Sequence, residues 1–207
     1  GSKVAAVLTL LLDALKGLIP VLVVKTWGPQ WGLGDGALAL VALGAFVGHL
    51  FPVFFGFKGG KGVATALGVL LGISGWLGLI VLGIWLVVAF VSRYSSMAAL
   101  LASLGAPVAY LILDGSLWSV ETPLLVAIMV MAALLVWRHR ENIGRLIRGE
   151  ESQIGGGKKE KQPVKPALTI RKTKPKAAPK NAAQVMAEMG AKAERKPRST
   201  KKNKHKK

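Results

Sequence analysis

The chain has 207 residues, 52% of them hydrophobic, and a formal net charge of +18 at pH 7. Such a composition argues against an ordinary soluble domain and is typical of an integral membrane protein. The sequence contains no cysteine, which excludes disulfides and thiolate sites, and its three histidines, one near the C-terminal end, argue against a zinc centre.

Apolar segments separated by short polar turns predict an all-α, polytopic membrane helix bundle of about six segments. The first, Val4 to Val24, is long enough to cross a hydrocarbon core of roughly 30 Å. Within it, Asp13 and Lys16 share one helix face, either as a structural pair between helices or as a substrate contact. The later segments are expected at residues 37–55, 63–73, 77–91, 97–113 and 120–137, and the short segment 63–73 is expected to cross only part of the bilayer.

Charged residues in the turns predict the orientation of the bundle. If the segments alternate in direction, the acidic turn residues Asp35, Asp114 and Glu121 fall on one side and the basic ones on the other. The basic set comprises Lys58, Lys61, Arg93, Arg138, Arg140, Arg145 and Arg148. Because Lys and Arg concentrate on the cytoplasmic side, we expect the basic turns and the C-terminal tail to be cytoplasmic.

The stretch from Gly48 to Thr65 is the strongest candidate for chemistry. It contains a glycine-rich turn with two lysines: Lys58, Gly59, Gly60, Lys61 and Gly62. Glycines let the backbone turn inward and present N–H groups to an anion, the lysines add charge, and the helix expected from Val63 adds its N-terminal amides. These features favour a phosphate ligand.

The alternative for this turn is a basic cytoplasmic loop without a ligand, although such a loop does not need three glycines so close together. A Walker A motif is excluded by spacing. Phe55 stands where that motif requires glycine, and Gly62 stands where it requires Ser or Thr.

A second polar stretch, Arg138 to Glu151, follows the last apolar segment. On a helix, His139 and Asn142 lie three residues apart on one face, with Arg145 nearby. Histidine can transfer a proton near neutral pH, asparagine can orient a hydroxyl, and arginine can hold a phosphate. A basic helix that touches anionic lipid headgroups remains the alternative.

In this order, the two stretches resemble the second and third signature motifs of the bacterial acyl-phosphate:glycerol-3-phosphate acyltransferases. The resemblance runs from about Lys3 to Glu151, includes the Asp13, Lys16, Gly17 pattern and excludes the tail. The residues that carry it are Gly48-His49, Phe51-Pro52, Phe57 to Thr65, His139-Arg140-Glu141-Asn142, Arg145 and Gly149-Glu150-Glu151. It implies an inner-membrane enzyme that transfers a fatty acyl group from acyl phosphate to the 1-hydroxyl of glycerol 3-phosphate, forming lysophosphatidic acid without acyl-CoA, metal or other cofactor.

The resemblance and the chemistry of the side chains together assign roles to individual residues. The phosphate-binding set is expected to be Gly59, Gly60, Lys61, Gly62 and Arg145, and the catalytic set Lys61, His139 and Asn142. Glu151 and His49 are expected to give structural support. We assign Lys61 to charge stabilisation, because an acyl phosphate is already activated and needs mainly positioning and oxyanion stabilisation. Either His139 or a substrate phosphate oxygen could act as general base.

The family's first signature, a glycine- and serine-rich loop after an initial membrane helix, is absent from the sequence. We therefore expect an N-terminally truncated chain that lacks one membrane segment, and its activity without that segment stays open. We divide the chain into a membrane acyltransferase domain, residues 1–151, and a disordered basic tail, residues 152–207, which holds eighteen Lys or Arg against three Asp or Glu.

The tail is expected to contact anionic lipid, with a transient helix over residues 181–193, and no specific nucleic-acid partner is expected. Two rival functions stay open. In a small transporter or channel subunit, Asp13, Lys16 and the broken segment 63–91 would line a substrate path. A membrane-anchored nucleic-acid binder would instead act through the tail.

Overall fold

The structure of the chain is a computed structural model that describes residues 2–57, 59–155 and 186. The chain separates into two units, residues 1–158 and 159–207, and all of the helices discussed below belong to the first. The predictions made for Lys58, for most of the basic tail and for a helix over residues 181–193 fall outside the described residues.

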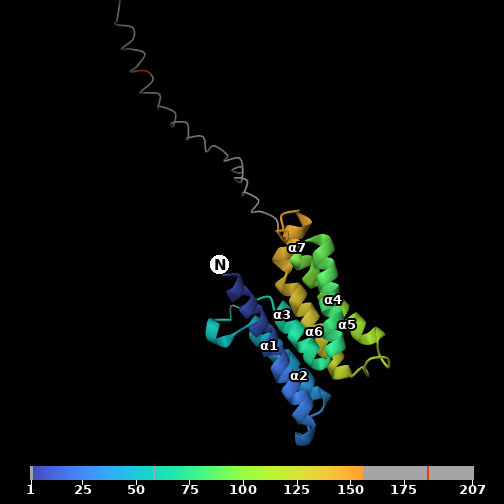
Figure 1. The fold of residues 1–207 in the computed structure, drawn as a ribbon. Coiled ribbons are helices and arrows are strands. Elements are labelled where there is room, and N and C mark those ends of the chain that lie inside the picture. The colour runs from blue at the N-terminus through green and yellow to red at the C-terminus, as the bar shows by residue number, and fades with distance from the viewer. Residues whose placement is uncertain (1, 58, 156–185, 187–207) are drawn as a thin grey trace, which may run out of the picture. The chain divides into compact units, whose positions relative to one another are not determined.

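Six apolar helices form the body, which confirms the predicted all-α bundle (Figure 1). They are α1 (Lys3–Trp27), α2 (Asp35–Leu50), α3 (Val63–Ile73), α4 (Gly75–Ser92), α5 (Ser95–Ile112) and α6 (Thr122–Arg138). Short 3₁₀ turns η1 (Gly28–Trp31) and η2 (Val53–Phe55) follow α1 and α2, and a polar helix α7 (Arg140–Ile147) follows α6.

Three helices of the described chain are long and apolar enough to cross a membrane: α1 with its η1 extension, α4 and α5. A fourth span results if α6 and α7, which are bent by 56° relative to each other, are taken together. The other two predicted segments form shorter helices, α2 and α3. The segment expected at 37–55 ends at Leu50, because Pro52 disfavours helical geometry in the residue before it, and Phe51 leaves the helix with φ −132°.

Helix α1 packs along α3 more extensively than any other pair of helices. Gly68 and Gly72 form a Gly-x-x-x-Gly pair on α3, a pattern that lets helix backbones approach closely in membranes. A Cβ at Gly68 would collide with the carbonyl of Ala14, and a Cβ at Gly72 would lie 2.7 Å from the Val21 side chain. The buried helix α3 is therefore fixed against α1 by backbone contact.

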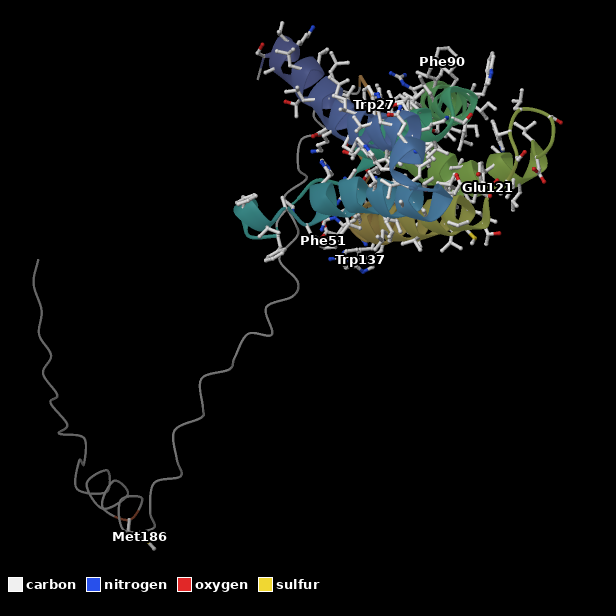
Figure 2. All side chains as sticks on the ribbon, turned by 90° about the horizontal axis from the view of Figure 1, so that it is seen from below. Trp27, Phe51, Phe90, Glu121, Trp137 and Met186 are labelled. Carbon is white, nitrogen blue, oxygen red and sulfur yellow. The ribbon has the colours of Figure 1, made fainter. Side chains whose placement is uncertain are left out.

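The core between α2, α3, α5 and α6 is apolar, and Phe46, Val69 and Ile128 are among its fully buried residues. Large apolar side chains also cover the outer surface, and Phe90 on α4 is 88% exposed (Figure 2). An apolar exterior around an apolar core is what a lipid environment requires, since the bilayer core offers no water to polar side chains.

Basic turns gather at one end of the bundle, as the alternation of segments predicts. Ile154, beyond α7, donates its amide to the carbonyl of Arg93 at 2.7 Å, and Gln153 donates to the Tyr94 hydroxyl at 3.2 Å. Asp35 and Glu121 instead line a separate cavity of about 430 Å³, together with Lys25. The bundle therefore has a basic end and an acidic end.

Candidate active site

The glycine-rich loop is folded tightly against the C-terminal end of α2. A Cβ at Gly59 would collide with the carbonyl of His49, and one at Gly60 would lie 2.5 Å from the His49 Nε2 atom. Gly62 has φ +82°, and a Cβ there would lie 2.6 Å from the Phe46 ring. Close packing at Gly59 and Gly60 and the left-handed backbone at Gly62 therefore favour glycine at these positions, so the fold alone gives a reason for them beside the predicted anion site.

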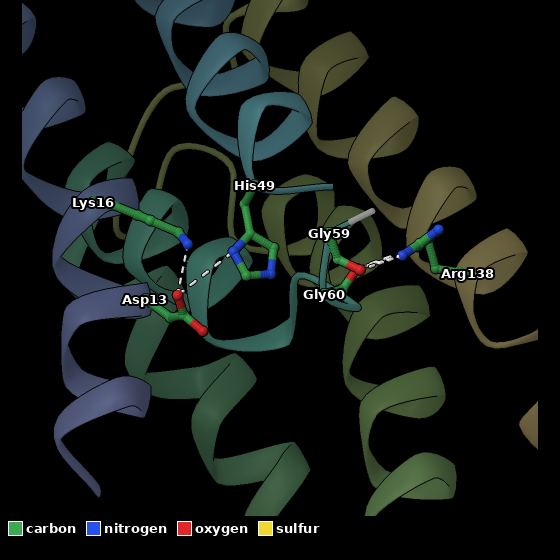
Figure 3. A network of polar contacts seen from close by, with 6 residues as sticks. All are labelled: Asp13, Lys16, His49, Gly59, Gly60 and Arg138. Atoms are coloured by element: carbon green, nitrogen blue, oxygen red, sulfur yellow. Dashed lines mark hydrogen bonds and ion pairs between the residues drawn. The ribbon is translucent and has the colours of Figure 1, made fainter. Parts of the chain in front are cut away.

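Arg138, the last residue of α6, binds this loop from the opposite side (Figure 3). Its Nη2 donates to the carbonyl of Gly59 at 2.6 Å and to that of Gly60 at 2.9 Å, and its Nε donates to Gly60 at 3.2 Å. These bonds join residues 78 and 79 positions apart in the sequence. They bring together the two stretches that the sequence singled out.

Aromatic contacts support the same junction. The rings of Phe51 and Trp137 lie 6.1 Å apart between centroids, and the Arg138 guanidinium lies 5.9 Å from the centroid of Phe51 (Figure 2). Such tilted ring pairs and cation–π contacts each add stabilisation beyond simple burial. The segment after α2 is thus anchored to the end of α6.

Asp13 connects α1 to this loop through His49 (Figure 3). Its Oδ1 lies 2.6 Å from Lys16 Nζ and 3.5 Å from His49 Nδ1. The ion pair predicted from the spacing of Asp13 and Lys16 is present. The additional contact with His49 favours the structural interpretation of the pair, because the other edge of that ring faces Gly60.

His139 is 2% exposed and lies between α6 and α7. Its Nδ1 lies 2.8 Å from the carbonyl of Leu135. A carbonyl can only accept a hydrogen bond, so Nδ1 carries the proton and Nε2 is the available nitrogen of the neutral ring.

Asn142 and Glu151 form a buried polar pair. The Nδ2 of Asn142 donates to Glu151 Oε1 at 2.6 Å, and Arg145 Nε donates to Glu151 Oε2 at 2.6 Å. Asn142 Oδ1 is buried and accepts no hydrogen bond from any described residue. The structure therefore places Arg145, predicted as a phosphate ligand, against Glu151, and it leaves an oriented acceptor on Asn142.

Glu151 is held in its charged form. Burial opposes ionisation, but the nearby Ser96 hydroxyl and the hydrogen bonds from Asn142 and Arg145 outweigh it, so the pKa of Glu151 lies below its ordinary value of 4.5. An ionised carboxylate accepts hydrogen bonds only, which fixes the Asn142 amide with its NH₂ toward Glu151 and its oxygen away from it. Glu151 thus holds the side chains of Asn142 and Arg145 in place.

An apolar cavity of about 360 Å³ adjoins these groups. It reaches Val63 and Ala64, the first residues after the glycine-rich loop, and Leu135, whose carbonyl contacts His139. Its remaining lining comes from α1, α3, α4, α5 and α6 and is almost entirely aliphatic or aromatic. Polar groups that suit a phosphate therefore border a space that suits a hydrocarbon chain.

Sequence reasoning missed two connections of this site. Arg138 was grouped with the second polar stretch, but no role in holding the loop was assigned to it, and the contact between Asp13 and His49 was not foreseen. Both contacts join distant positions of the chain, so residue spacing carries no signal for them. Both contacts become visible only in the folded structure, where these helices and the loop meet.

Comparisons with known proteins cover the whole helical body. Residues 1–149 match the family model for glycerol-3-phosphate acyltransferase. The glycerol-3-phosphate acyltransferase of Albidiferax ferrireducens is 53% identical over 155 residues, covering 75% of this chain and 69% of that protein. The corresponding protein of Paraburkholderia xenovorans is 54% identical over 166 residues, covering 80% of this chain and 75% of that protein.

Two crystal structures of PlsY, described as an integral membrane glycerol 3-phosphate acyltransferase, are each 38% identical in sequence to this chain. The lysophosphatidic acid form superposes with a TM-score of 0.65 and covers 73% of both chains. The glycerol 3-phosphate form gives a TM-score of 0.66 and covers 74% of this chain and 72% of the other. The family-model match, residues 1–149, includes the glycine-rich loop and all but the last two residues of the Arg138–Glu151 stretch.

Proposed function

The chain belongs to the glycerol-3-phosphate acyltransferase family of integral, multi-pass membrane proteins, and on this premise we propose that it acylates the 1-hydroxyl of glycerol 3-phosphate with an acyl phosphate as donor. The products would be lysophosphatidic acid and phosphate. The observation that best supports this proposal is the junction between the glycine-rich loop and the Arg138–Asn142 stretch. This junction joins the glycine-rich loop to the stretch that holds His139 and Asn142.

The glycine-rich loop would hold a substrate phosphate. The side chain of Lys61 is exposed there, and the amides of Gly60 and Lys61 make no hydrogen bond to any residue that the structure describes. Free amides next to a positive charge suit a phosphate oxygen. Lys61 would also stabilise the charge that develops as the acyl carbonyl is attacked.

Asn142 and His139 would act on the glycerol hydroxyl. The free Oδ1 of Asn142 can accept that hydroxyl's hydrogen bond and so orient its oxygen toward the acyl carbon. The new ester bond forms as the bond from the acyl carbon to the phosphate oxygen breaks. His139 Nε2 or an oxygen of the departing phosphate takes the hydroxyl proton.

The apolar cavity would receive the fatty acyl chain of the donor. Because Val63, Ala64 and Leu135 are among the residues that line the cavity, a chain inside it could bring its carbonyl group to the loop and to His139. The rival transporter function is not supported, because the polar network around Asp13 and Lys16 closes on the loop and the family match is to acyltransferases. No separate path across the bundle is needed to explain these residues.

The basic end of the bundle would face the cytoplasm of a bacterial inner membrane, with the tail on the same side. Because the chain contains no cysteine, single substitutions give a clean test. Arg148→Cys lies at the basic end and Ser116→Cys in the acidic loop, and both positions are exposed. In intact cells, an impermeant maleimide should label Ser116→Cys alone, whereas labelling of Arg148→Cys alone would reverse the assignment.

The division into an acyltransferase domain of residues 1–151 and a basic tail of residues 152–207 is also part of the proposal. The tail, with eighteen basic and three acidic residues, would bind anionic lipid. Deletion of residues 156–207 should leave acyl transfer within about twofold, because every residue assigned to the loop and its partners precedes position 156. A synthetic tail peptide should bind vesicles containing phosphatidylglycerol and lose that binding at high salt.

Lys61→Ala tests the central assignment. Removal of a charge that stabilises the transition state should lower kcat by about 10²–10³-fold or more. Lysophosphatidic acid formed from acyl phosphate and glycerol 3-phosphate should be measured in vesicles, with Arg148→Met as the matched control that loses an exposed charge. Normal membrane insertion with near-normal turnover of Lys61→Ala would refute the role of the loop.

A further inference from the structure

The loop's peptide groups have a defined direction because Arg138 binds two successive carbonyls. Gly59 and Gly60 both turn their C=O groups toward the guanidinium, at 2.6 and 2.9 Å from Nη2. In a planar trans peptide, the C=O of one residue and the N–H of the next point in opposite directions. The amides of Gly60 and Lys61 therefore both point away from Arg138.

Those two amides make no hydrogen bond with any described part of the chain. On the side opposite Arg138, the His49 ring faces Gly60 and is held in turn by Asp13 (Figure 3). The loop is thus fixed from two sides, by α6 on one and by α1 and α2 on the other. Successive backbone amides held at a fixed position can bind an oxyanion.

We propose that Arg138 is a positioning residue: by binding the carbonyls of Gly59 and Gly60, it presents the amides of Gly60 and Lys61 as a pair of donors to a substrate phosphate. This inference rests on the proposed function of the loop and deepens it. Arg138 binds the carbonyl side of the loop and does not contact the phosphate, which would bind on the amide side. Its planar fork is what matters, since it reaches two carbonyls at once, whereas a lysine offers only a point charge.

Steady-state kinetics in reconstituted vesicles separate positioning from mere structural support. With Arg138→Met, KM for the substrate whose phosphate occupies the loop should rise about tenfold to hundredfold, which is the usual effect of losing charge-assisted hydrogen bonds. The other substrate's KM should change less than twofold, and so should kcat per folded enzyme. Measuring KM for both glycerol 3-phosphate and acyl phosphate identifies which phosphate is bound.

Arg138→Lys keeps the charge but loses the fork, and it is the variant to rely on if Arg138→Met does not fold. Its affected KM should rise at least threefold. A KM like that of the unchanged chain in Arg138→Lys would show that charge alone suffices and would overturn the proposal. Unchanged KM values with a lower kcat, or equal rises in both KM values, would also overturn it.

Two parallel measurements separate failure of this inference from failure of the proposed function. Arg148→Met removes an exposed arginine that contacts Glu150 and should leave both KM values unchanged. If Lys61→Ala turns over almost normally, the loop is not the phosphate site and the proposed function fails with it. If Lys61→Ala is inactive while Arg138→Met has normal KM values, only the positioning role of Arg138 is wrong.

Discussion

At the acidic end of the bundle, polar side chains bind the backbone of their own loop, whereas at the basic end several polar atoms have no partner among the described residues. In the acidic loop, Trp118 Nε1 donates to the carbonyl of Tyr110 at 2.8 Å. The Val120 amide donates to Asp114 at 2.8 Å, and the Glu121 amide donates to the Tyr110 hydroxyl at 3.2 Å. These contacts close the connection between α5 and α6.

At the basic end, side chains also bind the backbone, but other polar groups there have no hydrogen-bond partner among the described residues. Arg138 donates hydrogen bonds to the carbonyls of Gly59 and Gly60, and Glu151 accepts one from the Asn142 side-chain nitrogen. The backbone amides of Gly60 and Lys61 and the Oδ1 atom of Asn142 have no hydrogen-bond partner within residues 2–57 and 59–155. Asn142 Oδ1 is buried, and buried polar groups normally have partners, so this oriented acceptor indicates a place for a polar ligand beside the exposed amides of the loop.

Asn142→Ala should have the largest effect of the changes that test this difference. It removes the open acceptor, so we expect kcat to fall about 100-fold, as when a reacting group loses its orientation. The measurement is lysophosphatidic acid formation at saturating concentrations of both substrates. Glu141→Ala is the control, because Glu141 is an exposed neighbour on α7.

Normal turnover of Asn142→Ala would mean that its oxygen is satisfied in another way and orients no substrate. Equal losses in Asn142→Ala and Glu141→Ala would instead point to a general disturbance of α7. Either result would remove the distinction between open and satisfied polar groups on which the comparison of the two ends depends.

Glu151→Gln should have a smaller effect, seen in stability. Loss of the charge-assisted bond from Arg145 should cost about 1.5–3 kcal/mol at neutral pH. Because the pKa of Glu151 is lowered by folding, its carboxylate stabilises the protein above the ordinary value of 4.5, and this contribution disappears as pH falls through the lower folded value. The difference in unfolding free energy between Glu151→Gln and the unchanged chain should therefore be constant above pH 4.5 and shrink below it.

Thermal unfolding in detergent micelles between pH 7 and pH 3 measures this difference. Glu150→Gln is the matched control, because Glu150 is exposed and pairs with the exposed Arg148. A pH-independent gap for Glu151→Gln, or the same curve for both variants, would show that Glu151 is not the group that titrates.

Local sequence signals predicted the helices well where glycine, serine or proline marks the ends of a helix. Helix α3 occupies residues 63–73 as expected, because Gly62 and Ser74 bound a run that is apolar apart from Thr65. The Ser74 hydroxyl accepts from the Leu77 amide at 3.4 Å, so the expected break is a cap of one residue. The end of α2 at Leu50 was also readable, since Pro52 is a stop signal that the prediction of a segment to residue 55 neglected.

The site was only partly readable from sequence. The residue types in the motifs pointed to the glycine-rich loop and to His139 and Asn142. That these two stretches meet is a property of the tertiary structure. Neither the hydrogen bonds from Arg138 to the loop nor the contact between Asp13 and His49 follows from residue spacing along one helix. The Gly68–Gly72 pair that fixes α3 against α1 was visible as a Gly-x-x-x-Gly pattern, yet its partner helix could not be named without the fold.

Tyr110→Phe should have the smallest effect and tests the acidic end. The change removes the hydroxyl that accepts from the Glu121 amide at 3.2 Å, while the ring stays stacked on Trp118 at 5.8 Å between centroids. Stability should fall by about 0.5–1.5 kcal/mol, the usual net value of one hydrogen bond. Acyl transfer should stay within twofold, because this hydroxyl serves the fold alone. A tenfold loss of turnover without loss of stability would give the acidic end a part in the reaction and would erase the contrast between the two ends.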